Sequence, residues 1–366
     1  MEVPAVPPEA VQEGLTGVRQ IPAEDIDATF KSNTIDLVSK PLGSRIVSLS
    51  DEWFASASNL TTPTPPVRKP GVFTHAGAWY DGWETRRHNR APFDFVIFRL
   101  GVASGRVHGV EVDTAFFNGN HAPEVSVEGC ALGADDDDDE ARLGAPDFPA
   151  WEPVLPRQEC GPSRRHAWLL PPRPAAPAYT HVRLAMYPDG GIARFRLYGL
   201  AEPVFPAAAD AVLDLAAAVN GGVAAACSDQ HFGAKDNLLL PGRGVDMGDG
   251  WETKRTRGPH VDWVVVKLGA PGEVVKVVVD TAHFRGNFPQ KVAVFAGRWA
   301  EGVLPGSEDK GWVEVLEPME TGPDREHEYG ADVLKNVKGE TYSHLKLVII
   351  PDGGVKRFRV FGRRRV

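Results

Sequence analysis

The chain of 366 residues repeats itself, and this duplication restricts its possible folds more than any other feature. Residues 79–87 read WYDGWETRR and residues 247–255 read MGDGWETKR, which are identical at six of nine positions. Three further pairs of similar segments follow in the same order: 94–101 with 262–269, 112–120 with 279–287, and 188–199 with 351–362. Four matched blocks in one order indicate a tandem duplication of a single domain.

Short apolar runs within each copy predict β-strands. Residues 95–100 and 263–268 are rich in valine and aromatic residues and are bounded by turn residues. Residues 194–198 alternate between apolar and polar side chains, which places Phe195 and Leu197 toward a core. Combined with 38 glycines and 31 prolines, this pattern predicts an all-β protein of two tandem jelly-roll β-sandwich domains.

The repeat also predicts the domain limits. We expect a tail over residues 1–25, a first domain over 26–202, a linker over 203–219 and a second domain over 220–366. The alanine-rich stretch that begins at Pro206 predicts a short helix in the linker.

The first copy contains extra residues, because the offset between copies falls from 247 − 79 = 168 to 351 − 188 = 163. We place them at the acidic run 135–140 and expect a solvated loop there. A calcium site is the alternative, but the run lacks the spaced ligands and the turn glycine of a calcium-binding loop.

Several matched residues have structural interpretations. Asp81 and Asp249 precede glycine and are expected in turns, while the matched tryptophans Trp83 and Trp251 are expected in the core. Four arginines alternate with core residues, so we expect them on a solvated sheet face or between the two copies: Arg194, Arg196, Arg357 and Arg359.

Composition excludes several classes of function. The net charge of −9, from 49 acidic and 40 basic residues, argues against a nucleic-acid partner. No apolar run approaches the ~20 residues that span a membrane. The first residues do not resemble a secretory signal, and the three cysteines lack metal-type spacing, so we expect a cytoplasmic protein.

The doubled motifs resemble those of the allantoicase family. The resemblance rests on Asp-Gly-Trp-Glu-Thr-[Arg/Lys]-Arg, Val-Asp-Thr-Ala-x-Phe-x-Gly-Asn and Pro-Asp-Gly-Gly-x-x-Arg-Phe-Arg, each present twice, and extends from Ile35 to Gly362. It implies two domains related to galactose-binding and discoidin-like modules. It also implies a homo-oligomer that hydrolyses a small ureide, allantoate, to ureidoglycolate and urea in purine breakdown.

That reaction breaks the bond between a central carbon and a urea nitrogen. It requires an acid for the departing nitrogen and a base for water, and carboxylates or histidines can serve as both. An arginine would bind the substrate carboxylate through paired hydrogen bonds, and amide side chains would match the ureido groups. No cofactor is expected: the chain contains no His-Glu-x-x-His motif and no Cys/His quartet, although a divalent metal held by carboxylate oxygens stays open.

The candidate site residues lie in the doubled motifs and the loops that follow them. As catalytic candidates we take Glu84, Glu252, Asp113, Asp280 and His283. As substrate-binding candidates we take Arg86, Arg87, Arg255, Asn118, Asn120, Arg285 and Asn287. No residue is assigned to a metal.

Three alternatives stay open at this point. Asp113 and Asp280 can instead cap their own loops, and the Glu/Arg charges can pair locally. The copies differ at Phe116 versus His283 and at Asn118 versus Arg285, which favours the second copy if only one is active, unless His121 supplies a histidine to the first. The chain can also be a non-catalytic tandem carbohydrate or small-ligand binding module, or an inactive paralogue retained as a partner subunit.

Overall fold

The computed structural model describes residues 17–133, 136–145, 147–208 and 210–365. Most of the expected tail and Asp135 of the acidic run lie outside these residues. The chain forms two compact units, one comprising Met1–Phe30 and Asp36–Glu202 and the other comprising Lys31–Ile35 and Pro203–Val366.

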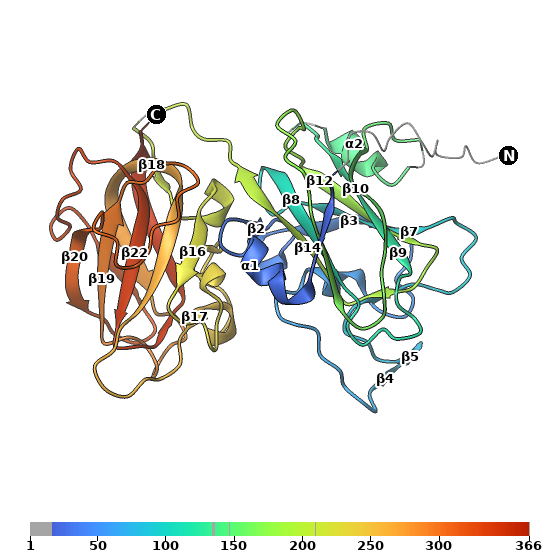
Figure 1. Cartoon of the computed structure of the whole chain (residues 1–366), viewed down its shortest axis with the longest axis horizontal. Helices are drawn as coiled ribbons and strands as arrows, with labels where there is room; N and C mark the ends of the chain where they lie inside the picture. Colours follow the sequence, from blue (N-terminus) through green and yellow to red (C-terminus); the bar gives the residue numbers. More distant parts are fainter. Residues whose placement is uncertain (1–16, 134–135, 146, 209, 366) are drawn as a thin grey trace. The chain divides into compact units, whose positions relative to one another are not determined.

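The first unit is a sandwich of two five-stranded antiparallel sheets (Figure 1). Phe98 and Phe195 come from different sheets, are fully buried and have ring centroids 5.5 Å apart, so the core lies between the sheets. One sheet has the order β1 (Arg19–Ile21), β11 (Arg165–Leu169), β8 (Ser104–Asp113), β14 (Arg194–Glu202) and β2 (Ile35–Asp36). The other has the order β10 (Glu152–Glu159), β9 (Glu124–Cys130), β12 (His181–Tyr187), β7 (Asp94–Arg99) and β3 (Arg45–Leu49).

Smaller elements complete the first unit. Two short ladders pair β6 (Trp83–Glu84) with β13 (Gly191–Ile192) and β4 (Phe73–Thr74) with β5 (Gly77–Ala78). The helices are α1 (Ile26–Phe30), α2 (Asp137–Arg142) and the 3-10 turns Ala23–Asp25, Lys40–Leu42 and Ala57–Thr61.

The second unit follows the same general plan, with a different central strand. A single strand of 19 residues, β18 (Asp262–Asp280), replaces both β7 and β8, so the main strands of the second unit form one continuous eight-stranded sheet. The first half of β18 pairs with β16 (Val223–Cys227) and β22 (Tyr342–Ile350), and its second half with β21 (Glu326–Tyr329) and β24 (Arg357–Arg364). The remaining elements are β15 (Val212–Asp214), β17 (Trp251–Glu252), β19 (Lys291–Gly297), β20 (Val313–Glu320), β23 (Gly354–Val355) and the 3-10 turns Ala218–Asn220, Lys235–Leu239 and Met247–Asp249.

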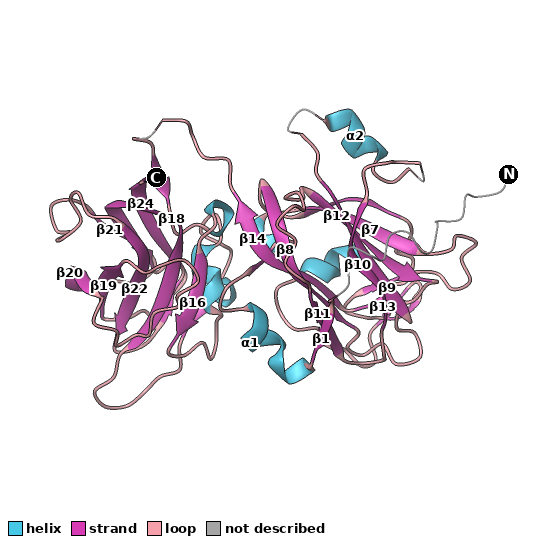
Figure 2. Ribbon diagram, turned by 45° about the horizontal axis from the view of Figure 1, so that its top comes forward, coloured by secondary structure: helices cyan, strands magenta, loops and turns pink. Residues whose placement is uncertain are grey.

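The predicted all-β class and the tandem β-sandwich duplication are confirmed. Strands dominate both units in Figure 2, and the helices drawn there are short. Trp83 and Trp251 are both fully buried, as expected from their matched positions.

The prediction of a linker helix is wrong. Val212–Asp214 forms strand β15, which pairs antiparallel with β24. The Asp214 carboxylate accepts hydrogen bonds from the backbone N–H groups of Ala216 and Val360, which fixes this segment to the second sandwich. Helix propensity is a weak preference, and here strand pairing overrides it.

The acidic run is also not simply a solvated loop, because α2 forms within it. Glu140 connects this helix to the sheet: its carboxylate accepts hydrogen bonds from the Arg45 guanidinium at 2.6 and 2.9 Å, and it lies 2.9 Å from His181 Nε2. The insertion is therefore fastened to the edge of the first sandwich.

The expectation that the alternating arginines are solvated is wrong as well. Arg194 and Arg357 are 3% and 2% exposed, because polar loops cover the outer sheet faces of both units. Arg194 donates to both Asp81 oxygens, at 3.1 and 2.8 Å. Charged groups can occupy such a buried position only when they are paired and hydrogen-bonded.

Candidate functional site

A two-residue ladder in each unit fixes the position of a glutamate. Trp83 lies in the core and its Nε1–H donates to the Asp51 carbonyl at 2.7 Å, while Trp251 makes the matching bond to Asp229 at 2.8 Å. Successive side chains of a strand point to opposite faces. The buried tryptophans therefore direct Glu84 and Glu252 away from the core.

An asparagine from a distant loop holds each glutamate. Asn120 Nδ2 donates to Glu84 Oε1 at 2.8 Å, and Asn287 Nδ2 donates to Glu252 Oε1 in the second unit. The same hydrogen bond in both units shows that the Gly-Asn loop positions the glutamate of the Glu-Thr strand.

The Pro-Asp-Gly-Gly segment is the third part of the chain that contributes to each site. Asp189 Oδ2 accepts a hydrogen bond from the His88 backbone N–H at 2.8 Å, and Asp352 Oδ2 accepts one from Thr256 at 2.8 Å. The last glycine of the segment is required because a Cβ on Gly354 would overlap the Phe284 ring. Each aspartate thus binds the segment that follows the Glu-Thr strand, in addition to its place in a turn.

An arginine completes each cluster. We define the first cluster as Glu84, Arg87, Asn120 and Asp189, and the second cluster as Glu252, Arg255, Asn287 and Asp352. The Arg87 guanidinium lies 4.0 Å from Glu84 Oε1 and 3.7 Å from Asp189 Oδ1. Burial raises the pKa of Glu84, while the hydrogen bond from Asn120 and the charge of Arg87 act in the opposite direction.

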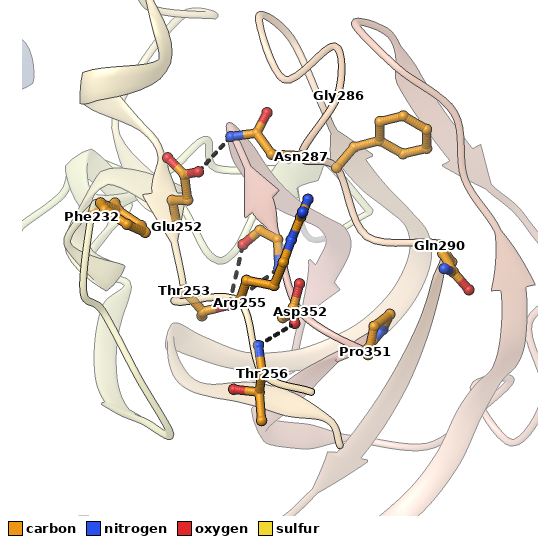
Figure 3. A pocket seen from close by; sticks show the side chains of 12 residues that line it. Phe232, Glu252, Thr253, Arg255, Thr256, Gly286, Asn287, Gln290, Pro351 and Asp352 are labelled. Carbon is orange, nitrogen blue, oxygen red and sulfur yellow. Dashed lines mark hydrogen bonds between the residues drawn. The ribbon is translucent and has the colours of Figure 1, made fainter. Parts of the chain in front are cut away.

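The second cluster borders a pocket of about 650 Å³. Figure 3 shows the Glu252 and Asn287 side chains meeting at one end, with the Arg255 side chain extending into the pocket. The other lining residues are Phe232, Thr253, Thr256, Gly286, Phe288, Gln290, Pro351, Asp352 and Gly353. The volume suits a small polar molecule.

The predicted aspartates have a different role in the structure. Asp113 Oδ1 accepts the Ala115 N–H at 2.8 Å, and Asp280 Oδ1 accepts the Ala282 N–H at 2.9 Å, so each caps the loop that follows its strand. Asp280 also forms a two-bond ion pair with Arg243. Asp280 does not line the pocket of the second unit.

The remaining predicted residues have other contacts. Arg285 pairs with Asp324 at 3.1 Å, and the His283 backbone N–H binds the same carboxylate. Arg86 stacks over the Trp53 ring with its guanidinium carbon 4.4 Å from the centroid. The carbonyl oxygen of Asn118 lies 2.9 Å from His121 Nδ1. The structure therefore brings together Glu84 with Arg87 and Asn120, and Glu252 with Arg255 and Asn287, out of the predicted set.

Sequence reasoning missed the carboxylates of Asp189 and Asp352, and the pocket residues Phe232 and Gln290. The doubled Pro-Asp-Gly-Gly motif was the available signal, but turn formation already explained an aspartate before glycine. Phe232 and Gln290 lie outside the doubled blocks, so only the fold reveals them.

In the described part of the chain, no group of three or more His, Cys, Asp or Glu side chains is placed to hold a metal ion. Cys130 and Cys160 are buried and Cys227 is half-buried, and all three are free thiols. Burial raises the pKa of Cys160 to about 12. This thiol is therefore a structural group and not an activated nucleophile.

These features define a class: a tandem-repeat β-sandwich protein with an ionisable polar cluster in each repeat and a small-molecule pocket beside the second. Comparison with known proteins narrows the class. The allantoicase repeat model matches residues 35–202 and 213–365. The chain belongs to the allantoicase family.

Individual relatives agree with this assignment. The chain is 60% identical to an allantoicase of Neurospora crassa over 348 residues, covering 95% of this chain and 96% of that protein. It is 51% identical to the allantoicase of Saccharomyces cerevisiae over 340 residues, covering 91% and 94%. The crystal structure of allantoicase from Saccharomyces cerevisiae superposes with a TM-score of 0.81 at 47% identity, covering 94% of this chain and 99% of that chain.

No helix in the described ranges has both the length and the apolar character needed to cross a membrane.

Proposed function

We propose that this protein is an allantoicase, an enzyme that hydrolyses allantoate to ureidoglycolate and urea in purine degradation. The names of its relatives support this, since allantoicases match over nearly the full chain. The single structural observation that carries the proposal is the repeated cluster of a glutamate, an asparagine, an arginine and an aspartate.

The cluster contains the groups that the reaction requires. The water oxygen bonds to the central carbon of allantoate, and the C–N bond breaks with its electron pair passing to the urea nitrogen. The proton that water loses is the proton that this nitrogen gains, so one glutamate can take it and deliver it. The asparagine amide keeps one glutamate oxygen in place and leaves the other for this transfer.

The location, oligomeric state and partners of the protein are also proposed. We place the enzyme in the cytoplasm, as a homo-oligomer acting on a small ureide without nucleic-acid or membrane partners and without a cofactor. The acidic net charge of −9 supports the lack of a nucleic-acid partner.

A urea-release assay tests the proposal. Purified protein is incubated with allantoate, with and without a chelator, and urea and ureidoglycolate are followed together. Equal amounts of both products are expected. Binding of allantoate without release of urea under any metal condition would instead support the alternative of a non-catalytic small-ligand module.

A further inference from the structure

The two clusters share their residue types, but they differ in how open they are to a ligand. In the first cluster Glu84 and Asp189 are only 6% and 7% exposed, and Arg87 lies against both. In the second cluster Glu252 and Asp352 are half-buried, whereas the arginines of both clusters are exposed. The carboxylates of the second cluster are therefore accessible from the pocket.

The arginines differ most. Arg87 is close to two carboxylates, whereas within the described residues no carboxylate oxygen lies within 4.0 Å of the Arg255 guanidinium. The backbone diverges directly after each arginine, because His88 adopts a left-handed conformation with φ of 58° and its counterpart Thr256 does not. A β-branched threonine is disfavoured in that conformation. The replacement of His88 by Thr256 in the second copy thus coincides with a different backbone conformation and with different contacts of the preceding arginine.

Two further differences favour the second pocket for a ureide. Phe54 and Phe232 are equivalent, since their backbone N–H groups bind the carbonyls of Glu84 and Glu252 at 3.0 and 3.1 Å. Phe54 is half-buried, but Phe232 is 64% exposed and lines the pocket as an apolar wall. Gln290 adds an amide to the same pocket, where Pro123 occupies the equivalent strand start of the first unit.

We infer that the second pocket is the carboxylate-binding substrate site, with Arg255 as the specificity-determining residue, and that the first cluster has become an internally paired structural element. Arg255 binds the anionic carboxylate, the Gln290 amide faces the ureido groups, and Asn287 holds Glu252 in position. The identity of the anion rests on the proposed function, whereas the choice of pocket and of arginine rests on the contacts above.

Calorimetric titration with a matched pair of ligands tests this inference. N-carbamoylglycine carries one carboxylate and one ureido group and has no second urea to lose, and N-carbamoylglycinamide is its neutral counterpart. Wild-type protein should bind the acid more tightly than the amide. Arg255→Gln should weaken binding of the acid by about 10- to 100-fold, the range for charge-assisted hydrogen bonds, and leave the amide nearly unchanged.

Three variants serve as comparisons. Arg255→Lys retains the charge without the paired geometry and should give an intermediate loss. Lys254→Gln removes a neighbouring exposed charge that pairs with Asp229 at 3.7 Å, and should bind both ligands like wild type. Arg87→Gln removes the two ion pairs of the first cluster and should leave the binding of both ligands close to that of wild type.

The outcomes are separable. A larger loss of acid binding in Arg87→Gln than in Arg255→Gln, or equal losses in both, would overturn the assignment of the second pocket. Equal loss of acid and amide binding in Arg255→Gln would show that this arginine does not recognise the carboxylate. If the binding pattern holds but wild type releases no urea from allantoate, the proposed function fails and the anion site stands.

Discussion

The buried ion pair between Arg194 and Asp81 allows a quantitative test of how the first sandwich is held together. Removing the carboxylate with Asp81→Ala leaves the guanidinium in a site where its side chain is only 3% exposed. The substitution breaks two charged hydrogen bonds, at 2.8 and 3.1 Å, and the bond that Asp81 accepts from the Val67 backbone N–H. An unpaired buried charge costs about 3–5 kcal/mol of unfolding free energy.

For a unit of this size, each kcal/mol lowers the melting temperature by about 2–4 °C, so a decrease of roughly 6–20 °C is expected. Differential scanning calorimetry of the full chain is the appropriate assay, because two units can unfold in separate transitions. The decrease should affect the transition of the first unit.

Two further variants make this prediction specific. Asp81→Ala combined with Arg194→Met should recover part of the loss, since the double variant buries no unpaired charge. Lys276→Ala, which breaks an exposed pair with Glu328, should melt like wild type. A melting temperature for Asp81→Ala equal to that of wild type would refute the reasoning.

Three other predictions concern the second unit. Gly354→Ala should strongly destabilise it in thermal melts, because the added Cβ would overlap the Phe284 ring, whereas Gly286→Ala meets open space and should not. Burial lowers the pKa of His344 from 6.5 to about 4, so the unfolded state takes up a proton at a higher pH than the folded state. The stability that this histidine contributes is present above pH 6.5 and is lost as the pH falls toward 4. His344→Phe should remove this part of the pH dependence of unfolding. Asn287→Ala frees Glu252 and should lower kcat more than it raises KM, and an unchanged kcat would contradict a positioning role.

The duplication made most of the fold predictable from sequence. The matched blocks predict two sandwiches and two buried tryptophans, Trp83 and Trp251, because each motif occurs in both copies and its interpretation in one copy can be compared with the other. The linker helix failed because local alanine content cannot reveal that Asp214 accepts bonds from Val360, a residue far along the chain. The exposure of Arg194 was misjudged for a similar reason, since the loop that carries Asp81 covers it only in three dimensions.

The candidate site was predictable in part. Glu252, Arg255 and Asn287 were all identified from doubled motifs, although nothing in the sequence placed them in one pocket. Arg285 differs between the copies but pairs with Asp324, and the same carboxylate binds the His283 backbone N–H. Two features distinguish the second cluster: its carboxylates are more exposed, and no carboxylate of the described residues lies within 4.0 Å of the Arg255 guanidinium. Both depend on side-chain positions.

The most direct test of the account compares urea release from allantoate by Glu252→Gln and Glu84→Gln at matched pH. Because the second pocket is inferred to bind substrate, kcat/KM of Glu252→Gln should fall by about 10²–10⁴-fold, the usual contribution of a general acid–base group. Glu84→Gln should fall much less. A loss in Glu84→Gln that equals or exceeds the loss in Glu252→Gln would contradict the account.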